Sequence, residues 1–116
     1  MKSQALVVTN NHRSSLGYTP GLAAFGLSLQ EMRTFDTARI WLKSSFDPVL
    51  IVIDVHFFAD EIEAFLHYVR VELGNQNVPI VIVGCDTDFM RAFGATKCLP
   101  RPADLHEIIS VLEPVR

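Results

Sequence analysis

The sequence lacks the patterns that mark most metal, redox and nucleic-acid-binding proteins. Its two cysteines, Cys85 and Cys98, form no CxxC pair and are too few for a zinc site. Its four histidines never fall into an HExxH or similar ligand spacing. The net charge of -3 comes without a basic stripe, so we expect no nucleic-acid binding by this domain.

Long hydrophobic runs and targeting signals are also missing. The longest apolar stretches have the length of strands, far short of a transmembrane helix. The first residues, Met1 to Gln4, lead into a short apolar run with no cleavage site, so we expect a cytoplasmic protein without membrane contact. The chain has 116 residues, of which 49% are hydrophobic, and this is enough for one compact domain over residues 1–116.

What the sequence does contain is a regular alternation of strand and helix patterns. Short apolar runs predict strands at residues 5–8, 28–33, 49–53, 78–83 and 97–99. Helical spacing and capping residues predict helices at residues 14–26, 36–45, 86–93 and 104–112, and another that begins near Asp60 and stops at Gly74-Asn75. Such alternation predicts a doubly wound α/β fold, in which five helices flank a five-stranded parallel sheet.

Two of the helices have predicted caps. Asp36 is placed to cap the helix at 36–45, and Asp104 to cap the helix at 104–112. In the helix at 36–45, the residues expected to face the core are Ala38, Ile40 and Trp41, with Leu42 at the margin of the stripe.

Asp54 is the first candidate for a functional residue. It ends the apolar run 49–53, which is typical of a central strand buried on both faces. In open α/β sheets the ligands and reactive groups gather beyond the carboxyl ends of such strands. The alternative is that Asp54 serves only as a helix cap or a turn residue.

Three segments carry a resemblance to a known family. Residues 46–54 are similar to the third strand and phosphate-accepting aspartate of response-regulator receiver domains, and residues 78–83 are similar to their fourth strand. Residues 94–102 resemble the Gly-Ala approach to the Lys-Pro signature of these domains. The chain therefore resembles a CheY-like receiver domain from about Gln4 to Leu112. The resemblance implies the strand order 2-1-3-4-5 and assigns the role of phosphoryl acceptor to Asp54.

The resemblance also implies a metal site, which is degenerate here. In receiver domains the aspartate takes a phosphoryl group from a kinase histidine with the help of a divalent ion, held by acidic residues after the first strand. The matching positions hold Thr9 and Asn10, and His56 stands where a backbone carbonyl binds the ion. Neutral side chains replace negative charges, so we expect Asp54 to bind Mg²⁺ only weakly.

Other switch positions have changed as well. Gly84 and Cys85 stand where receiver domains have a small hydroxyl residue, and they offer only a backbone N–H or a weak thiol donor. Arg101 replaces the lysine of the family pattern, which keeps the charge on a larger planar group. The resemblance implies a cis peptide at Arg101-Pro102. Only nine residues separate Gly84 from Gly94, so a shortened fourth helix is expected.

These features predict an atypical receiver domain in two-component phosphorelay signalling. We expect a non-enzymatic module whose partner is a histidine kinase, a phosphotransfer protein, another signalling protein or a second copy of the chain. The alternative is a flavodoxin-like module that binds a small molecule or carries a phosphoryl group, because one scaffold hosts many functions.

Two arrangements of the pocket remain open at this stage. If Arg101 reaches Asp54, a permanent ion pair would make phosphorylation unnecessary. If the pocket is open to water, Asp54 could still accept a phosphoryl group.

Overall fold

A computed structural model of the chain describes residues 3–10, 12–44, 47–54, 59–84 and 93–112. The strands are β1 (Gln4–Thr9), β2 (Ser28–Met32), β3 (Leu50–Asp54), β4 (Ile80–Val83) and β5 (Lys97–Leu99). The helices are α1 (His12–Ser15), α2 (Thr19–Ala24), α3 (Phe35–Lys43), α4 (Ala59–His67), the π-helix η1 (Tyr68–Glu72) and α5 (Leu105–Ser110).

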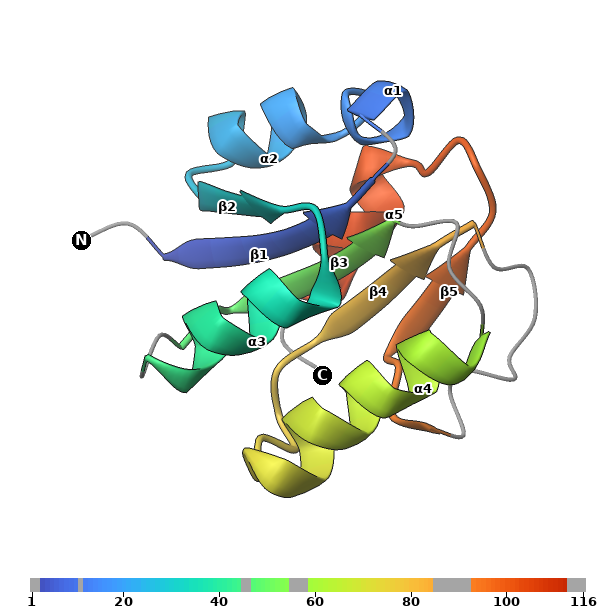
Figure 1. Ribbon diagram of the computed structural model, residues 1–116. Coiled ribbons are helices and arrows are strands. Elements are labelled where there is room, and N and C mark those ends of the chain that lie inside the picture. Colours follow the sequence, from blue (N-terminus) through green and yellow to red (C-terminus); the bar gives the residue numbers. More distant parts are fainter. Residues whose placement is uncertain (1–2, 11, 45–46, 55–58, 85–92, 113–116) are drawn as a thin grey trace.

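The strands form one parallel sheet in the order β2-β1-β3-β4-β5, as predicted (Figure 1). The order reverses at β1, because the chain first adds β2 on one side and then β3 on the other. In the register of the sheet, Asp54 at the end of β3 lies between Thr9 of β1 and Val83 of β4. The predicted doubly wound fold is therefore confirmed.

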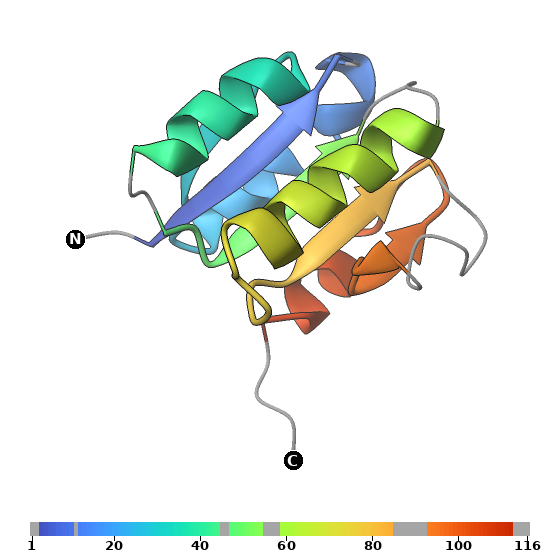
Figure 2. The same cartoon turned by 60° about the horizontal axis from the view of Figure 1, so that its bottom comes forward.

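Helices cover both faces of the sheet and create two cores. Helices α3 and α4 lie together on one face (Figure 2), where they pack on Ile51 and Ile53 of β3. Leu50 and Val52 of the same strand point to the other face, where they join residues of α2 and α5. Because successive side chains of a strand alternate between faces, a strand between two helical layers is apolar throughout. This explains the continuous run that indicated a central strand.

The helix predicted at 14–26 is divided into α1 and α2. Backbone bonds from Gly17 N–H to the Ser14 carbonyl (3.1 Å) and from Tyr18 N–H to the Ser15 carbonyl (3.1 Å) close a turn between them. Pro20 then lies in the first turn of α2, where its missing N–H costs no helical hydrogen bond. Tyr18 lies in the turn between the two helices. Its side chain points inwards and is only 1% exposed.

The predicted cap of α3 is wrong by two positions. The cap is Thr34, whose Oγ1 accepts a hydrogen bond from Thr37 N–H at 3.1 Å. Asp36 lies inside the first turn and forms a 3.1 Å ion pair with Arg39 on the surface. Threonine and aspartate both favour the cap position, so the sequence did not distinguish between them.

The buried stripe of α3 also differs from the prediction in two residues. Ala38 and Leu42 are buried as expected, and Trp41 is half-buried against the core. Ile40, however, is 66% exposed, and Phe35 takes a buried place at the start of the helix. The observed stripe starts one turn earlier than predicted because the helix itself starts at Phe35.

The later elements follow the prediction closely. Helix α4 continues into η1, and Gly74, with φ +70, follows as the predicted stop. Asp104 caps α5 by accepting a hydrogen bond from His106 N–H at 2.8 Å. The predicted helix at 86–93, with its shortening, lies almost wholly outside the described residues. Among the helices that the structure describes, none is long and apolar enough to cross a membrane.

Candidate functional site

Asp54 is completely buried, although it is charged and stands at the end of a strand. The burial follows from its position, because β1 and β4 flank β3 on both sides. Removing a carboxylate from water is costly unless other groups pair with it and donate hydrogen bonds to it. The site therefore depends on which groups surround the two carboxylate oxygens.

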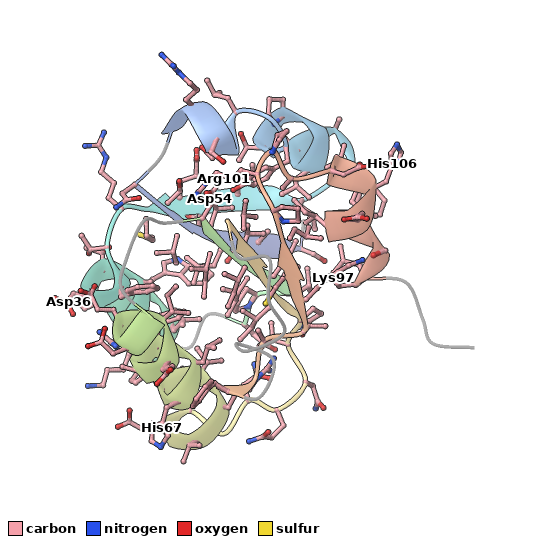
Figure 3. The ribbon with its side chains drawn as sticks, turned by 90° about the vertical axis from the view of Figure 1, so that its right-hand side faces the viewer. Asp36, Asp54, His67, Lys97, Arg101 and His106 are labelled. Carbon is pink, nitrogen blue, oxygen red and sulfur yellow. The ribbon has the colours of Figure 1, made fainter. Side chains whose placement is uncertain are left out.

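One oxygen of Asp54 is paired with Arg101. The guanidinium Nη2 lies 2.7 Å and Nε 3.1 Å from Oδ1. Arg101 comes from the loop between β5 and α5, and its peptide bond to Pro102 is cis, as the resemblance implied. Figure 3 shows the labelled Asp54 and Arg101 side by side. The sequence left open whether Arg101 reaches the carboxylate, and the structure shows that it does.

The other oxygen of Asp54 accepts a hydrogen bond from Tyr18. The phenol O–H donates to Oδ2 over 2.7 Å. Burial raises the pKa of the Tyr18 phenol far above its ordinary value, and the hydrogen bond to the Asp54 carboxylate raises it further. Tyr18 is therefore a permanent donor at neutral pH, and both carboxylate oxygens are engaged.

Sequence reasoning did not find Tyr18. Tyr18 lies in the segment predicted as a single helix, and a tyrosine in a helix is usually interpreted as a core residue. Its approach to Asp54 depends on the turn between α1 and α2, which no periodicity indicates. Ser14 was likewise missed, and its Oγ lies 3.3 Å from Arg101 Nε.

Gly84 lies directly beneath the Arg101 guanidinium. A Cβ atom added to Gly84 would stand 2.7 Å from Arg101 Cζ and closer still to Nη1. Its N–H donates to the Leu99 carbonyl at 2.7 Å. This bond ties the end of β4 to β5, so the Gly84 N–H is engaged there, while Cys85, the other residue considered as a donor, lies outside the described residues.

Thr9 is the last residue of β1, and Asn10 follows it. Thr9 is buried beside Asp54 in the sheet, whereas Asn10 is exposed. Together with Glu31, Met32 and Arg33 they line a cleft of about 440 Å³. This cleft lies along the carboxyl ends of β1 and β2, so it opens to one side of Asp54.

The other predicted pocket residues, His56 and Cys85, lie outside the described part of the chain. Within the described residues, no three His, Cys, Asp or Glu side chains gather as metal ligands. A divalent ion at Asp54 would compete with the guanidinium at Oδ1 or with the phenol at Oδ2. Among the described residues, the donors around Asp54 therefore do not favour a divalent ion.

No protein-family model matches the sequence, and no curated protein matches it significantly. Solved structures do match. A response regulator from Thermotoga maritima gives a TM-score of 0.80 at 14% identity, over 97% of this chain and 98% of that one. The apo receiver domain of nitrogen regulatory protein C gives 0.76 at 20% identity, over 97% and 93%. The chain has the response-regulator receiver fold.

A third match is a longer protein whose structure contains a phosphorylated aspartic acid. The response regulator from Burkholderia pseudomallei gives a TM-score of 0.76 at 20% identity, over 96% of this chain, which spans 66% of that longer chain. Its structure contains a phosphorylated aspartic acid and a calcium ion. In the present chain, Arg101 and Tyr18 engage the Asp54 carboxylate.

Proposed function

We propose that this chain is an atypical receiver domain of two-component signal transduction, which acts through protein contacts and accepts a phosphoryl group at Asp54 weakly or not at all. The observation that carries the proposal is the engagement of both Asp54 oxygens, by Arg101 and by Tyr18. The receiver fold supports the signalling role. We call Asp54 closed when Arg101 and Tyr18 engage its two oxygens, and this closed state supports the atypical behaviour.

The chemistry of phosphoryl transfer explains why this arrangement opposes it. The acceptor oxygen must direct a lone pair at phosphorus, and a cation must neutralise the charge that gathers between two anionic partners. Here the Arg101 guanidinium of the same chain already neutralises the Asp54 carboxylate. Arg101 would have to leave Asp54 before the carboxylate could act as an acceptor, and this would leave a buried charge without its cation.

The partners that fit this role are other proteins of the pathway. The partner would bind a surface that forms without phosphorylation. It would be a histidine kinase, a phosphotransfer protein, another signalling protein or a second copy of the chain. We place this activity in the cytoplasm, where a phosphorelay operates.

Treatment with acetyl phosphate or beryllofluoride, in the presence of Mg²⁺, tests the proposal. We expect the intact mass and the amide NMR spectrum to stay unchanged, while an ordinary receiver domain treated in parallel is modified. The Asp54→Asn variant identifies the site of any label that does form. Stoichiometric labelling of Asp54 at the rate of the ordinary receiver domain would overturn the proposal.

A further inference from the structure

Gly84 and Arg101 fit together in a way that the sequence did not indicate. Gly84 follows β4 with φ +95, and the nearest side-chain atoms to its missing Cβ all belong to the Arg101 guanidinium. The planar group therefore rests on the bare backbone of Gly84. Any side chain at position 84 would occupy the space that the guanidinium now fills.

Arg101 cannot withdraw from Gly84 without leaving Asp54. Its Nε–H is shared between Asp54 Oδ1 at 3.1 Å and Ser14 Oγ at 3.3 Å, and its Nη2 donates to Asp54 Oδ1 at 2.7 Å. The collision with a new Cβ would involve the end of a flexible side chain, so Arg101 would move rather than the backbone. Its hydrogen bonds to Asp54 would then break.

We propose that Gly84 is a positioning residue, which admits the Arg101 guanidinium and so keeps Asp54 closed. The two departures from the receiver pattern, glycine for a hydroxyl residue and arginine for lysine, are on this view one coupled change. The inference rests on the proposed closed state of Asp54 and adds the residue that maintains it.

The shape of arginine explains why the two positions are coupled. A guanidinium is planar and directs several N–H groups in fixed directions, so one face can lie on a glycine while its edge reaches Asp54 and Ser14. A lysine ammonium is a compact point charge on a flexible stem, and it would need no bare backbone beneath it. Lysine at 101 would therefore tolerate a side chain at 84.

The chain offers a matched control for the Gly84→Ala substitution. Gly26 has φ +110, and no atom lies within 4 Å of the position that its Cβ would take. Gly26→Ala therefore introduces the same kind of backbone strain without a collision. The difference between the two variants isolates the contact with Arg101.

The experiment compares Gly84→Ala and Gly26→Ala, each in the wild-type and Arg101→Lys backgrounds. We expect Gly84→Ala to lower the melting temperature more than Gly26→Ala does. This excess loss of melting temperature should fall by at least half in the Arg101→Lys background. The backbone strain at position 84 is the same in both backgrounds, so a change in the excess reports the contact with Arg101. An excess that is equal in both backgrounds would overturn the proposal.

Hydrogen exchange of the Arg101 Nε–H group gives a second measurement that needs no Arg101 variant. We expect this exchange to become about tenfold faster or more in Gly84→Ala, the factor that loss of one charge-assisted hydrogen bond allows. Gly26→Ala should leave it unchanged. Unaltered exchange in a folded Gly84→Ala protein would overturn the coupling, even if wild-type Asp54 resists phosphorylation. Labelling of wild-type Asp54 would instead overturn the proposed function.

Discussion

Arg101 Nη2 lies 2.7 Å from Oδ1 of the fully buried Asp54. The arginine side chain is 23% exposed, so the ion pair joins a dry carboxylate to a cation at the edge of the solvent. Such a pair is more sensitive to the loss of one partner than to the loss of both, because a buried charge left alone has nothing to offset its desolvation.

Replacement of Arg101 by methionine should destabilise the fold strongly. We expect a loss of about 3 kcal/mol in the free energy of unfolding, measured by urea denaturation, since among the described residues Tyr18 would be left as the side-chain donor to Asp54. Asp36→Asn removes one partner of the surface pair with Arg39 and should cost less than about 1 kcal/mol. The double variant Asp54→Asn/Arg101→Met should recover part of the loss, and a double variant less stable than Arg101→Met would contradict the explanation.

Replacement of Tyr18 by phenylalanine tests the second hydrogen bond. It leaves Asp54 Oδ2 without the phenol donor, and we expect a loss of about 1–3 kcal/mol in the free energy of unfolding. Tyr68→Phe is the matched control, because the Tyr68 O–H lies 3.5 Å from the Arg39 carbonyl and makes a weak bond. Equal losses of unfolding free energy in the two variants would show that the bond to Asp54 contributes no more stability than a weak hydrogen bond.

Alkaline pH should reduce the advantage that Tyr18 provides. Its phenol has a raised pKa in the folded protein, whereas in the unfolded chain it ionises near pH 10. The stabilisation is therefore complete below about pH 10 and declines as the pH rises further, by up to about 1.4 kcal/mol per pH unit. The difference in unfolding free energy between wild type and Tyr18→Phe should shrink accordingly, and a difference that grows with pH would refute this.

Divalent ions should have little effect on the stability of the protein. A ligand that binds the folded state raises the melting temperature as its concentration exceeds its dissociation constant, and at Asp54 both oxygens are already engaged. We expect millimolar Mg²⁺ or Ca²⁺ to leave the melting temperature of the wild type unchanged. A rise that the Asp54→Asn variant abolishes would show that an ion displaces Arg101.

Much of the fold was readable from local patterns. The runs at 49–53 and 78–83 predicted two central strands, because only strands covered on both faces are apolar throughout. Asp104 and Gly74 marked a helix start and a helix stop correctly. The cap at Thr34 and the exposure of Ile40 were missed because neighbouring residues were equally good candidates, and packing decided between them.

The pattern of residues along the chain was enough to place Asp54 at the end of a central strand and at the reactive edge of a parallel sheet. The side chains that surround Asp54 became known from the three-dimensional fold. Tyr18 and Arg101 are separated from Asp54 by 36 and 47 positions, and their approach depends on a turn between two helices and on a loop after the last strand. Hydrogen bonds act over about 3 Å of space rather than along the chain, so no local pattern records them.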